Sequence, residues 1–290
     1  MIFSRDKSQM CNNLLQFAHV YAWAREHNRS VMSMRFSYKY PYFNISKSKY
    51  ASFPMYLFAK YTAAVKLLPT ASFKHDDCDK DALEQMMLRH KHIVVSGWFV
   101  RYYDLFLKYR SEICELFTVK KQYSDNVKEK MMRCEAGTAD FLRLGVHIRR
   151  GDYATWNNGI YCYSDETYAS YISAFAKLHP EKPIHVYLST NDASVKAEHY
   201  QQMLSTTKPN NGNGTVTSAS NIKVHLLGGN AVEDLFMLSE CDYLIGAPST
   251  YSLVAAMYRD IPLCRMDTVK AEDLTKESFR LFDYWFRRIV

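Results

Sequence analysis

Apolar positions recur with two different periods along the chain. Over residues 13–27 they return every three or four positions, and Asn12 is placed to cap them, which predicts an amphipathic helix. A short apolar run at residues 93–99 predicts a strand. For the rest of the first half, the pattern predicts helices and loops around a few strands.

After about residue 138 the pattern becomes regular, because short apolar runs alternate with helical segments. The runs are residues 142–149, 184–189, 222–227, 243–246 and 262–266. One intervening helix begins at Asn230 with Glu233 three positions later, the spacing of a capping box. Such alternation predicts a parallel sheet with crossover helices. The polar stretch at residues 120–138 reads as a linker, so we expect two domains, residues 1–135 and 136–290.

Composition narrows the class of partner. The 290 residues include 37 basic and 30 acidic side chains, a net charge of +7 that favours anionic partners such as phosphates, nucleic acid or an acidic membrane. The stretch at residues 38–61 is rich in tyrosine and lysine. This composition is compatible with a binding site for a polar polymer, and also with a solvated, partly buried loop. Seven scattered cysteines without a CxxC pair suggest neither a zinc site nor a disulfide framework, so a reducing compartment is expected.

The segment at residues 147–153 concentrates the clearest chemistry. Arg149 and Arg150 come at the carboxyl end of a predicted strand, where open α/β sheets bind ligands. Adjacent guanidinium groups repel each other unless an anion lies between them, and their forked donors match phosphate oxygens. A diphosphate is the expected ligand. The competing interpretation is an exposed basic turn in which Asp152 pairs with one arginine.

A second segment, residues 234–250, predicts a helix, a strand and a turn of small residues. Ser249 and Thr250 then begin another helix, over residues 251–258. A helix N-terminus offers unpaired N–H groups and a partial positive charge, so this element also favours phosphate. Capping of the helix alone explains the two hydroxyls equally well.

A metal site is the weaker possibility. Asp77 and Asp79, within the acidic run at residues 75–79, resemble the acidic pair of metal-dependent sugar transferases, but no apolar strand flanks them. The chain contains none of the P-loop, dinucleotide-binding or nucleophile-elbow motifs, which argues against those three chemistries.

Residues 147–152, His-Ile-Arg-Arg-Gly-Asp, resemble the H-x-R-R-x-D motif of fucosyltransferases, in the form seen in the α-1,2-fucosyltransferase family (glycosyltransferase family 11). Residues 11–18 are similar to that family's G-N-Q-x-x-Q-[FY]-A, and residues 234–250 to its D-x-x-x-[ML]-S…S-[ST]-[FY]-S. The order and spacing of all three segments match. The chain departs from the pattern at Cys11, where the family has glycine, and in the polar residues 3–10, where the family has a strand and a glycine-rich turn.

The resemblance implies a GT-B-like α/β fold, with two facing Rossmann-type domains and the donor site mainly in the C-terminal one. Residues 1–135 would then carry the acceptor side and residues 136–290 would bind GDP-fucose, with no metal or other cofactor. The implied roles are donor diphosphate for Arg149 and Arg150, guanine for His147 and Asp234, phosphate for Ser249 and Thr250, and phosphate or fucose for Asn12.

The resulting hypothesis is inverting transfer of L-fucose from GDP-fucose to a glycan hydroxyl, expected to be O2 of galactose, in surface polysaccharide or oligosaccharide synthesis. Asp152 is the first candidate for the base, with Asp165 and Glu166 as others. Two alternatives stay open: a transferase with another GDP-sugar donor, and a non-catalytic protein that binds polyanions. As a transferase, the chain would bind no nucleic acid.

The sequence also predicts a location. With no apolar run of the roughly 18 residues that a membrane span needs, we expect a bacterial, cytoplasmic enzyme that acts at the inner face of the membrane. Basic patches would hold it there as a peripheral protein. A lumenal domain cut from a longer chain would read the same.

Overall fold

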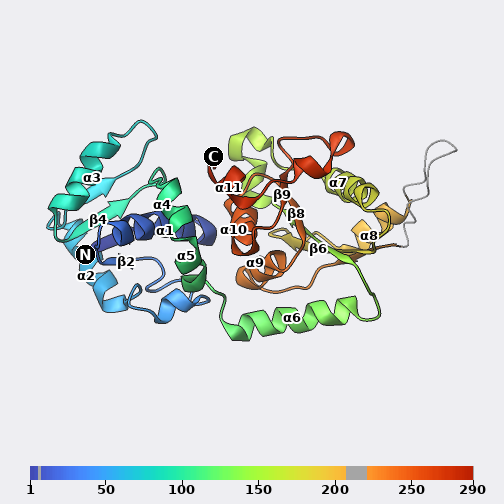
Figure 1. Cartoon of the computed structure of the whole chain (residues 1–290), viewed down its shortest axis with the longest axis horizontal. Coiled ribbons are helices and arrows are strands. Elements are labelled where there is room, and N and C mark those ends of the chain that lie inside the picture. Colours follow the sequence, from blue (N-terminus) through green and yellow to red (C-terminus); the bar gives the residue numbers. More distant parts are fainter. Residues whose placement is uncertain (6–7, 207–220, 290) are drawn as a thin grey trace. The chain divides into compact units, whose positions relative to one another are not determined.

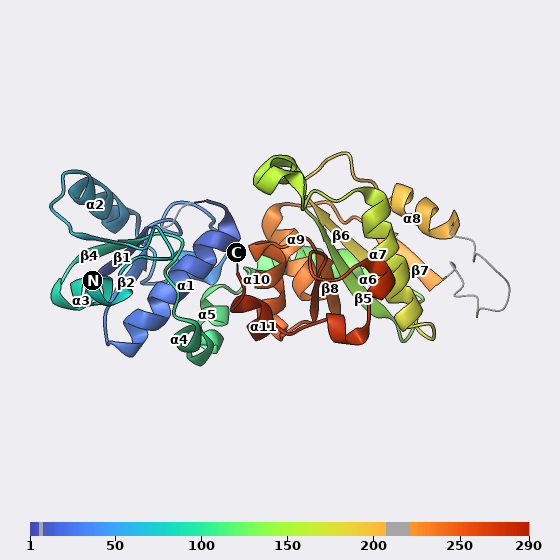
Figure 2. The same cartoon turned by 90° about the horizontal axis from the view of Figure 1, so that it is seen from above.

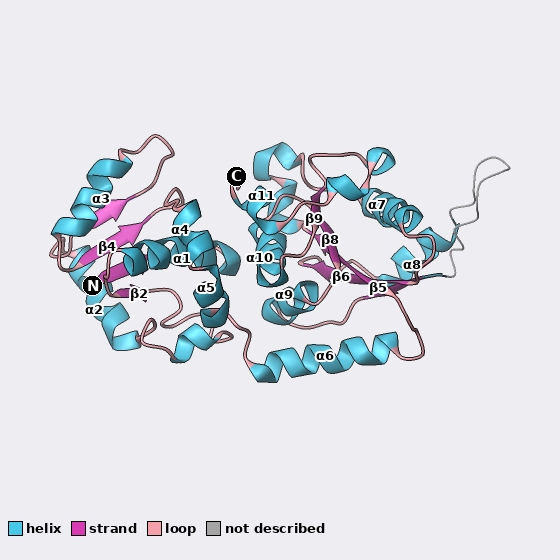
Figure 3. Ribbon diagram, viewed as in Figure 1, coloured by secondary structure: helices cyan, strands magenta, loops and turns pink. Residues whose placement is uncertain are grey.

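A computed structural model describes residues 1–5, 8–206 and 221–289. The chain divides into two compact units, Met1–Lys120 and Lys121–Val290, and each is built around its own parallel sheet (Figure 1, Figure 3). The sequence pattern of residues 205–221, with Asn-Gly-Asn-Gly at its centre, predicts a surface loop, and residues 207–220 of it lie outside the described residues.

The first unit has a four-stranded parallel sheet in the order β2-β1-β4-β3. Its strands are β1 (Ile2–Arg5), β2 (Val31–Ser33), β3 (Thr70–Ser72) and β4 (Ile93–Ser96). The chain therefore does open with a short strand, β1, although the polar residues 3–10 suggested a shortened or irregular start. Ile2 and Phe3 are fully buried, and a strand of four residues needs only these two apolar side chains to anchor it between its neighbours.

Helices cover both faces of this sheet (Figure 2). They are α1 (Met10–Glu26), α2 (Phe53–Ala64), α3 (Lys80–Arg89), α4 (Tyr103–Lys108) and α5 (Arg110–Leu116). The predicted helix is confirmed as α1, but its N-cap residue is Gln9, not Asn12. The apolar side chains of Met10 and Cys11 are buried, so the helix begins before the polar pair that we expected to cap it.

The second unit contains all five predicted strands in one parallel sheet of order β7-β6-β5-β8-β9. They are β5 (Leu142–Ile148), β6 (Ile184–Thr190), β7 (Ile222–His225), β8 (Tyr243–Gly246) and β9 (Leu263–Arg265). The longer helices between and after the strands are α7 (Asp165–Leu178), α8 (Ala197–Thr206), α9 (Ala231–Ser239), α10 (Thr250–Arg259) and α11 (Phe282–Phe286). The predicted capping box of Asn230 and Glu233 is present at the start of α9.

The prediction that residues 120–138 form a linker is wrong, because most of this stretch forms the helix α6 (Lys121–Glu135). This helix packs with the second unit: the Asn126 side chain donates to Glu233, 2.6 Å away, and Glu135 forms an ion pair with Arg143 at 2.7 Å. The chain therefore divides after residue 120, earlier than the boundary at 135 that we predicted. Val127 and Met131, both buried, follow helical spacing, and many charged neighbours obscured it.

Side chains of β5 alternate between the two faces of the sheet, as the period of a strand requires. Leu144, Val146 and Ile148 join the core beneath α7. On the other face, Gly145 leaves no room for a side chain, since a Cβ there would lie 2.6 Å from Cδ2 of Leu244. This close packing fixes β5 at the centre of the sheet and sets where its carboxyl end emerges.

None of the helices in the described part of the chain combines the length and the apolar character needed to cross a bilayer.

Candidate functional site

Most of the predicted site residues of the second unit meet at one edge of its sheet. Arg149 and Arg150 directly follow β5, and Ser249 lies three residues after the end of the neighbouring strand β8. Because the strands are parallel and Ile148 pairs with Thr190 of β6, the carboxyl ends of β6, β5 and β8 lie side by side. This is the edge at which open α/β sheets bind ligands.

Arg149 has a single ionic partner among the described residues. Its guanidinium is 2.8 Å from the Asp152 carboxylate and 5.4 Å from the centre of the Tyr153 ring. Its backbone N–H donates to the Tyr168 hydroxyl at 3.2 Å. The Asp152 side chain is more than half exposed, so solvent weakens this ion pair. Several of the five guanidinium N–H donors therefore remain for a ligand.

Arg150 is held differently, between two carboxylates. One terminal nitrogen contacts Asp165, and the other lies 3.2 Å from Asp192. The Tyr200 hydroxyl also donates to Asp165, at 2.6 Å. All three charged side chains are at least three-quarters buried. The charge of Arg150 is thus already compensated inside the protein, whereas that of Arg149 is compensated only weakly.

The turn after β5 is fixed by side chains of its neighbours. Asn191 brackets the backbone of Arg150, accepting from its N–H and donating to its carbonyl, both at 2.9 Å. The Tyr153 hydroxyl donates to the Pro248 carbonyl at 2.5 Å, which ties this turn to the one before α10. The two segments that the sequence singled out separately are therefore joined through the Tyr153 hydroxyl.

Tyr153→Phe removes the hydroxyl that contacts the Pro248 carbonyl and the Ser249 side chain, and keeps the ring. We expect the unfolding free energy to fall by about 1 kcal/mol, and the affinity for a phosphate-bearing ligand to fall severalfold. Denaturant unfolding and ligand titration check this. Tyr163→Phe, in a half-buried tyrosine outside the turn, is the control. Equal effects of the two changes would contradict the linking role.

The hydroxyl of Ser249 accepts from the Tyr251 N–H at 3.2 Å, so this residue is the N-cap of α10. The capping interpretation therefore holds for Ser249. Thr250 opens the helix and stays partly exposed. The N-terminus of α10 thus lies next to the Tyr153 turn, with its partial positive charge at the same edge as Arg149.

His147, the second-last residue of β5, is only 4% exposed. Its ring lies against that of Tyr251, with centroids 4.8 Å apart, and its Nδ1 has no hydrogen-bond partner among the described residues. Burial, with a smaller contribution from the charge of Arg149, lowers the pKa of His147 to about 3. The ring is neutral at physiological pH and lies beneath Tyr251.

Asp234 lies in the first turn of α9 and accepts from the Ser189 hydroxyl at 3.2 Å. Ser189 belongs to β6, so Asp234 faces the same edge of the sheet. Burial raises the pKa of this carboxyl to about 6, against an ordinary value near 4. A partly desolvated carboxylate with one weak partner is well suited to accept hydrogen bonds from a ligand.

The first unit holds the two remaining predicted elements. Asn12 lies in the first turn of α1 and donates to the Ser8 hydroxyl at 3.0 Å. Its role toward a donor substrate stays a prediction. Asp79 accepts from the Ala82 N–H at 2.9 Å and caps α3, which accounts for part of the acidic run. Within the described ranges, no three His, Cys, Asp or Glu side chains gather as a metal site.

Four residues that complete the edge were not selected from the sequence for these roles: Tyr153, Asp165, Asn191 and Asp192. Asn191 and Asp192 directly follow β6, at the same kind of position that pointed to Arg150. The preference of ligands for the carboxyl ends of strands, applied to β6, selects both residues. The contact from Tyr153 to Pro248 spans 95 residues and leaves no local signal.

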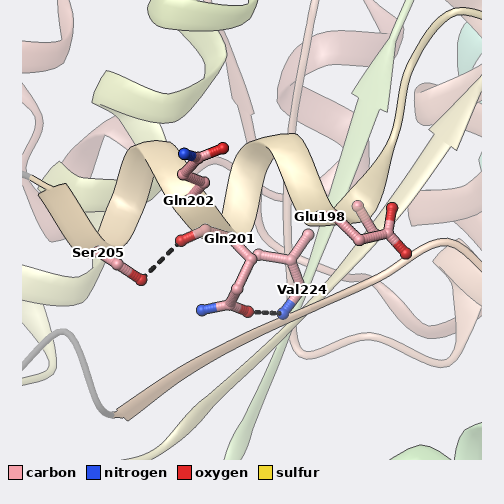
Figure 4. A pocket seen from close by; sticks show the side chains of 6 residues that line it. Glu198, Gln201, Gln202, Ser205 and Val224 are labelled. Carbon is pink, nitrogen blue, oxygen red and sulfur yellow. Dashed lines mark hydrogen bonds between the residues drawn. The ribbon is translucent and has the colours of Figure 1, made fainter.

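A pocket of about 470 Å³ lies elsewhere in this unit, between α8 and β7 (Figure 4). Gln201 closes one side of it, accepting from the Val224 N–H at 2.9 Å. None of the predicted site residues lines this pocket.

Sequence comparisons identify no relative: no protein-family model matches the chain, and neither does any curated protein. Solved structures do match. A mutant of FUT1 from Arabidopsis thaliana in complex with GDP superposes with a TM-score of 0.63 at 14% identity, over 97% of this chain and 72% of that one. The fucosyltransferase NodZ from Bradyrhizobium gives 0.55 at 14% identity, over 92% and 95% of the two chains. NodZ soaked with GDP-fucose gives 0.54 at 13% identity.

At such low identity the likeness concerns the fold. Two units, each with a parallel sheet and flanking helices, match these fucosyltransferases over nearly the whole chain. The predicted α/β, GT-B-like class is therefore confirmed.

Proposed function

We propose that the chain is an inverting fucosyltransferase that uses GDP-fucose and needs no metal. One observation carries the proposal: the weakly compensated Arg149 lies beside the α10 N-terminus, at the carboxyl edge of a sheet whose fold matches fucosyltransferases solved with GDP or GDP-fucose. Two sources of positive charge at one edge favour a diphosphate leaving group.

The two arginines divide the work. Arg149 binds the diphosphate, because its one partner, Asp152, is exposed and easily displaced or shared. Arg150 positions the turn, because Asp165 and Asp192 already engage both of its terminal nitrogens. The sequence hypothesis placed Arg150, together with Arg149, on the leaving group, and the geometry favours Arg149 as the catalytic residue.

Asp234 recognises the base of the nucleotide. Guanine presents adjacent N–H donors on one edge, and a partly buried carboxylate can accept from both. His147 contributes indirectly, since a ligand can reach its ring only if Tyr251 moves. It supports Tyr251 at the start of α10, where Thr250 and the helix N–H groups approach phosphate.

The reaction is an in-line displacement at C1 of fucose by an acceptor hydroxyl. Negative charge grows on the β-phosphate as the bond to fucose breaks, and a preorganised Arg149 stabilises it without an ion such as Mg²⁺. Asp152 is the proposed base. Because it pairs with Arg149, binding of the donor to Arg149 would orient the Asp152 carboxylate. We propose O2 of a galactose-terminated glycan as the acceptor, with Asn12 on the donor phosphate or fucose.

The raised pKa of Asp234 predicts a pH dependence of donor binding. Only the carboxylate accepts both guanine hydrogen bonds, so affinity for GDP-fucose should fall as the pH drops through about 6. GDP-fucose is the right ligand because its diphosphate is esterified at both ends and keeps its charge in this range. In Asp234→Asn, affinity at pH 8 should be about tenfold lower and independent of pH.

Calorimetric titration at several pH values between 5 and 8 measures this directly. Glu233→Gln, the adjacent change in the same helix turn, is the control: it should keep the pH dependence but move its midpoint to lower pH, because the charge of Glu233 helps to raise the pKa of Asp234. A wild-type affinity that stays constant across this range would contradict the role of Asp234.

The function is tested by GDP release from GDP-fucose in the presence of EDTA and a panel of galactose-terminated acceptors. Acceptor-stimulated release is the expected result. GDP-mannose as a competing donor distinguishes a fucosyltransferase from a transferase of another GDP-sugar.

A further inference from the structure

The positive charge of the chain is concentrated in one segment of the first unit. Residues 27–75 contain eight basic side chains and no Asp or Glu, a local charge of +8. The rest of the chain has 29 basic and 30 acidic residues, so its charge is −1. The basic residues of the segment are Arg29, Arg35, Lys39, Lys47, Lys49, Lys60, Lys66 and Lys74.

Helix α2, in the middle of this segment, is apolar on two faces. Its inner face is anchored by Ala59, which is buried against Phe3 and Val94 of the sheet. Its outer face is open: Tyr61 is 62% exposed, and Phe58, whose ring centroid also lies 6.2 Å from that of buried Phe3, is 48% exposed. Lys60 is the only charged residue in the helix.

Further apolar side chains extend this open face at both ends of the helix. Phe53 is 52% exposed at the start of α2, and Val65 and Leu67, just beyond its end, are 66% and 75% exposed. Together with Tyr38, Phe58, Tyr61, Lys60 and Lys66, these residues form what we call the α2 surface. So many exposed apolar side chains along one helix and its two ends are unusual on a soluble domain and mark a contact surface.

Basic and aromatic groups border the α2 surface in one connected row. The ammonium of Lys60 is 5.8 Å from the centre of the Tyr56 ring. Tyr56 stacks on Tyr38 with centroids 4.5 Å apart, and the Arg35 guanidinium is 5.8 Å from the Tyr38 ring. Tyrosine and lysine side chains are typical of the headgroup level of a membrane, above deeper phenyl and aliphatic groups.

The charge pattern decides among partners. A second copy of this chain would bring like charges of Lys60, Lys66 and Arg35 together at the surface, which opposes self-association. Nucleic acid would neutralise the lysines but would bury little of Val65 and Leu67. An anionic bilayer satisfies both features, because lipid phosphates meet the basic border and the acyl boundary receives the apolar side chains.

We propose that the α2 surface docks the protein peripherally on an anionic lipid bilayer. This inference goes beyond the proposed function and does not depend on it, since it rests on α2 and its neighbours alone. The sequence predicted that the protein attaches peripherally to a membrane, and the α2 surface is the part of the molecule that we propose makes this contact.

Flotation of the full chain with vesicles tests the proposal. Binding to vesicles of phosphatidylcholine with about 40% phosphatidylglycerol should exceed binding to phosphatidylcholine alone by tenfold or more, and should weaken as salt rises. Lys60→Gln with Lys66→Asn should reduce binding about thirtyfold, at about fivefold per lysine. Asparagine suits position 66 because its φ is 61°, in the left-handed region.

Phe58→Ser with Tyr61→Ser should also abolish most binding, and this loss should persist at low salt, where charge attraction is strongest. The matched control is Met132→Ser with Lys177→Gln, an exposed apolar residue and an exposed lysine on helices of the second unit. Circular dichroism and thermal unfolding verify that every variant folds.

Three results would overturn the proposal. One is equal binding of the wild type to neutral and anionic vesicles, or equal binding of the wild type and the α2 variants to anionic vesicles. A second is a dimer in sedimentation that the Phe58 and Tyr61 changes dissociate, which would make the surface a contact between copies. The third is tighter binding to single-stranded nucleic acid than to anionic vesicles.

Discussion

Arg149→Ala should lower kcat/KM for fucosyl transfer by a hundredfold or more and should destabilise the protein less than Arg150→Ala. Among the described residues, Arg149 forms an ion pair with the exposed Asp152 alone, so its loss leaves no buried charge without a partner. Losing a preorganised donor to the charge that develops on a leaving group costs about 10²–10³ in rate. GDP release from GDP-fucose, measured beside thermal unfolding, checks both parts.

Arg149→Lys refines this prediction. Lysine keeps the charge but lacks the planar fork. If the contact to the diphosphate is bidentate, kcat/KM of Arg149→Lys should therefore stay about tenfold below that of the wild type. Full activity in Arg149→Ala would contradict the assignment of this residue to the leaving group.

Arg150→Ala should act chiefly on stability. The change leaves Asp165 and Asp192 facing each other without their shared cation, in surroundings at least three-quarters buried. Breaking a fully buried pair costs about 3–5 kcal/mol, and partial exposure here lowers the expected loss of unfolding free energy to about 2–3 kcal/mol. For a domain of this size that is a fall in Tm of about 5–10 °C.

A compensating variant separates this effect from a direct role at the donor. In Arg150→Ala combined with Asp165→Asn, one of the two unpaired charges is removed, so part of the lost stability should return. Urea unfolding of the single and double variants measures it. A single variant that is fully stable yet inactive would show that Arg150, and not Arg149, binds the leaving group.

Much of the fold could be predicted because its signals are local. The five strands of the second sheet are short apolar runs between polar turns, and the capping box of α9 lies within four residues. The strand β1 and the helix α6 were missed for the opposite reason. β1 has only two fully buried apolar residues, and α6 shows its helical spacing through four buried positions among many charges.

The position of the site could also be predicted, but the division of labour within it could not. A strand with period two places Arg149 and Arg150 at the sheet edge without any structural information. Which guanidinium is already neutralised depends on Asp165 and Asp192, which lie 15 and 42 residues further along the chain. Contacts between distant segments leave no pattern in the sequence, so the two arginines looked equivalent.

The most direct test of the central claim is titration of the protein with GDP in EDTA, comparing the wild type with Arg149→Ala. We predict metal-independent binding to the wild type that the substitution weakens by tenfold or more, since a charged hydrogen bond contributes about 1.5–3 kcal/mol. No binding of GDP to the folded wild type would contradict the claim that this edge of the second sheet is a donor site.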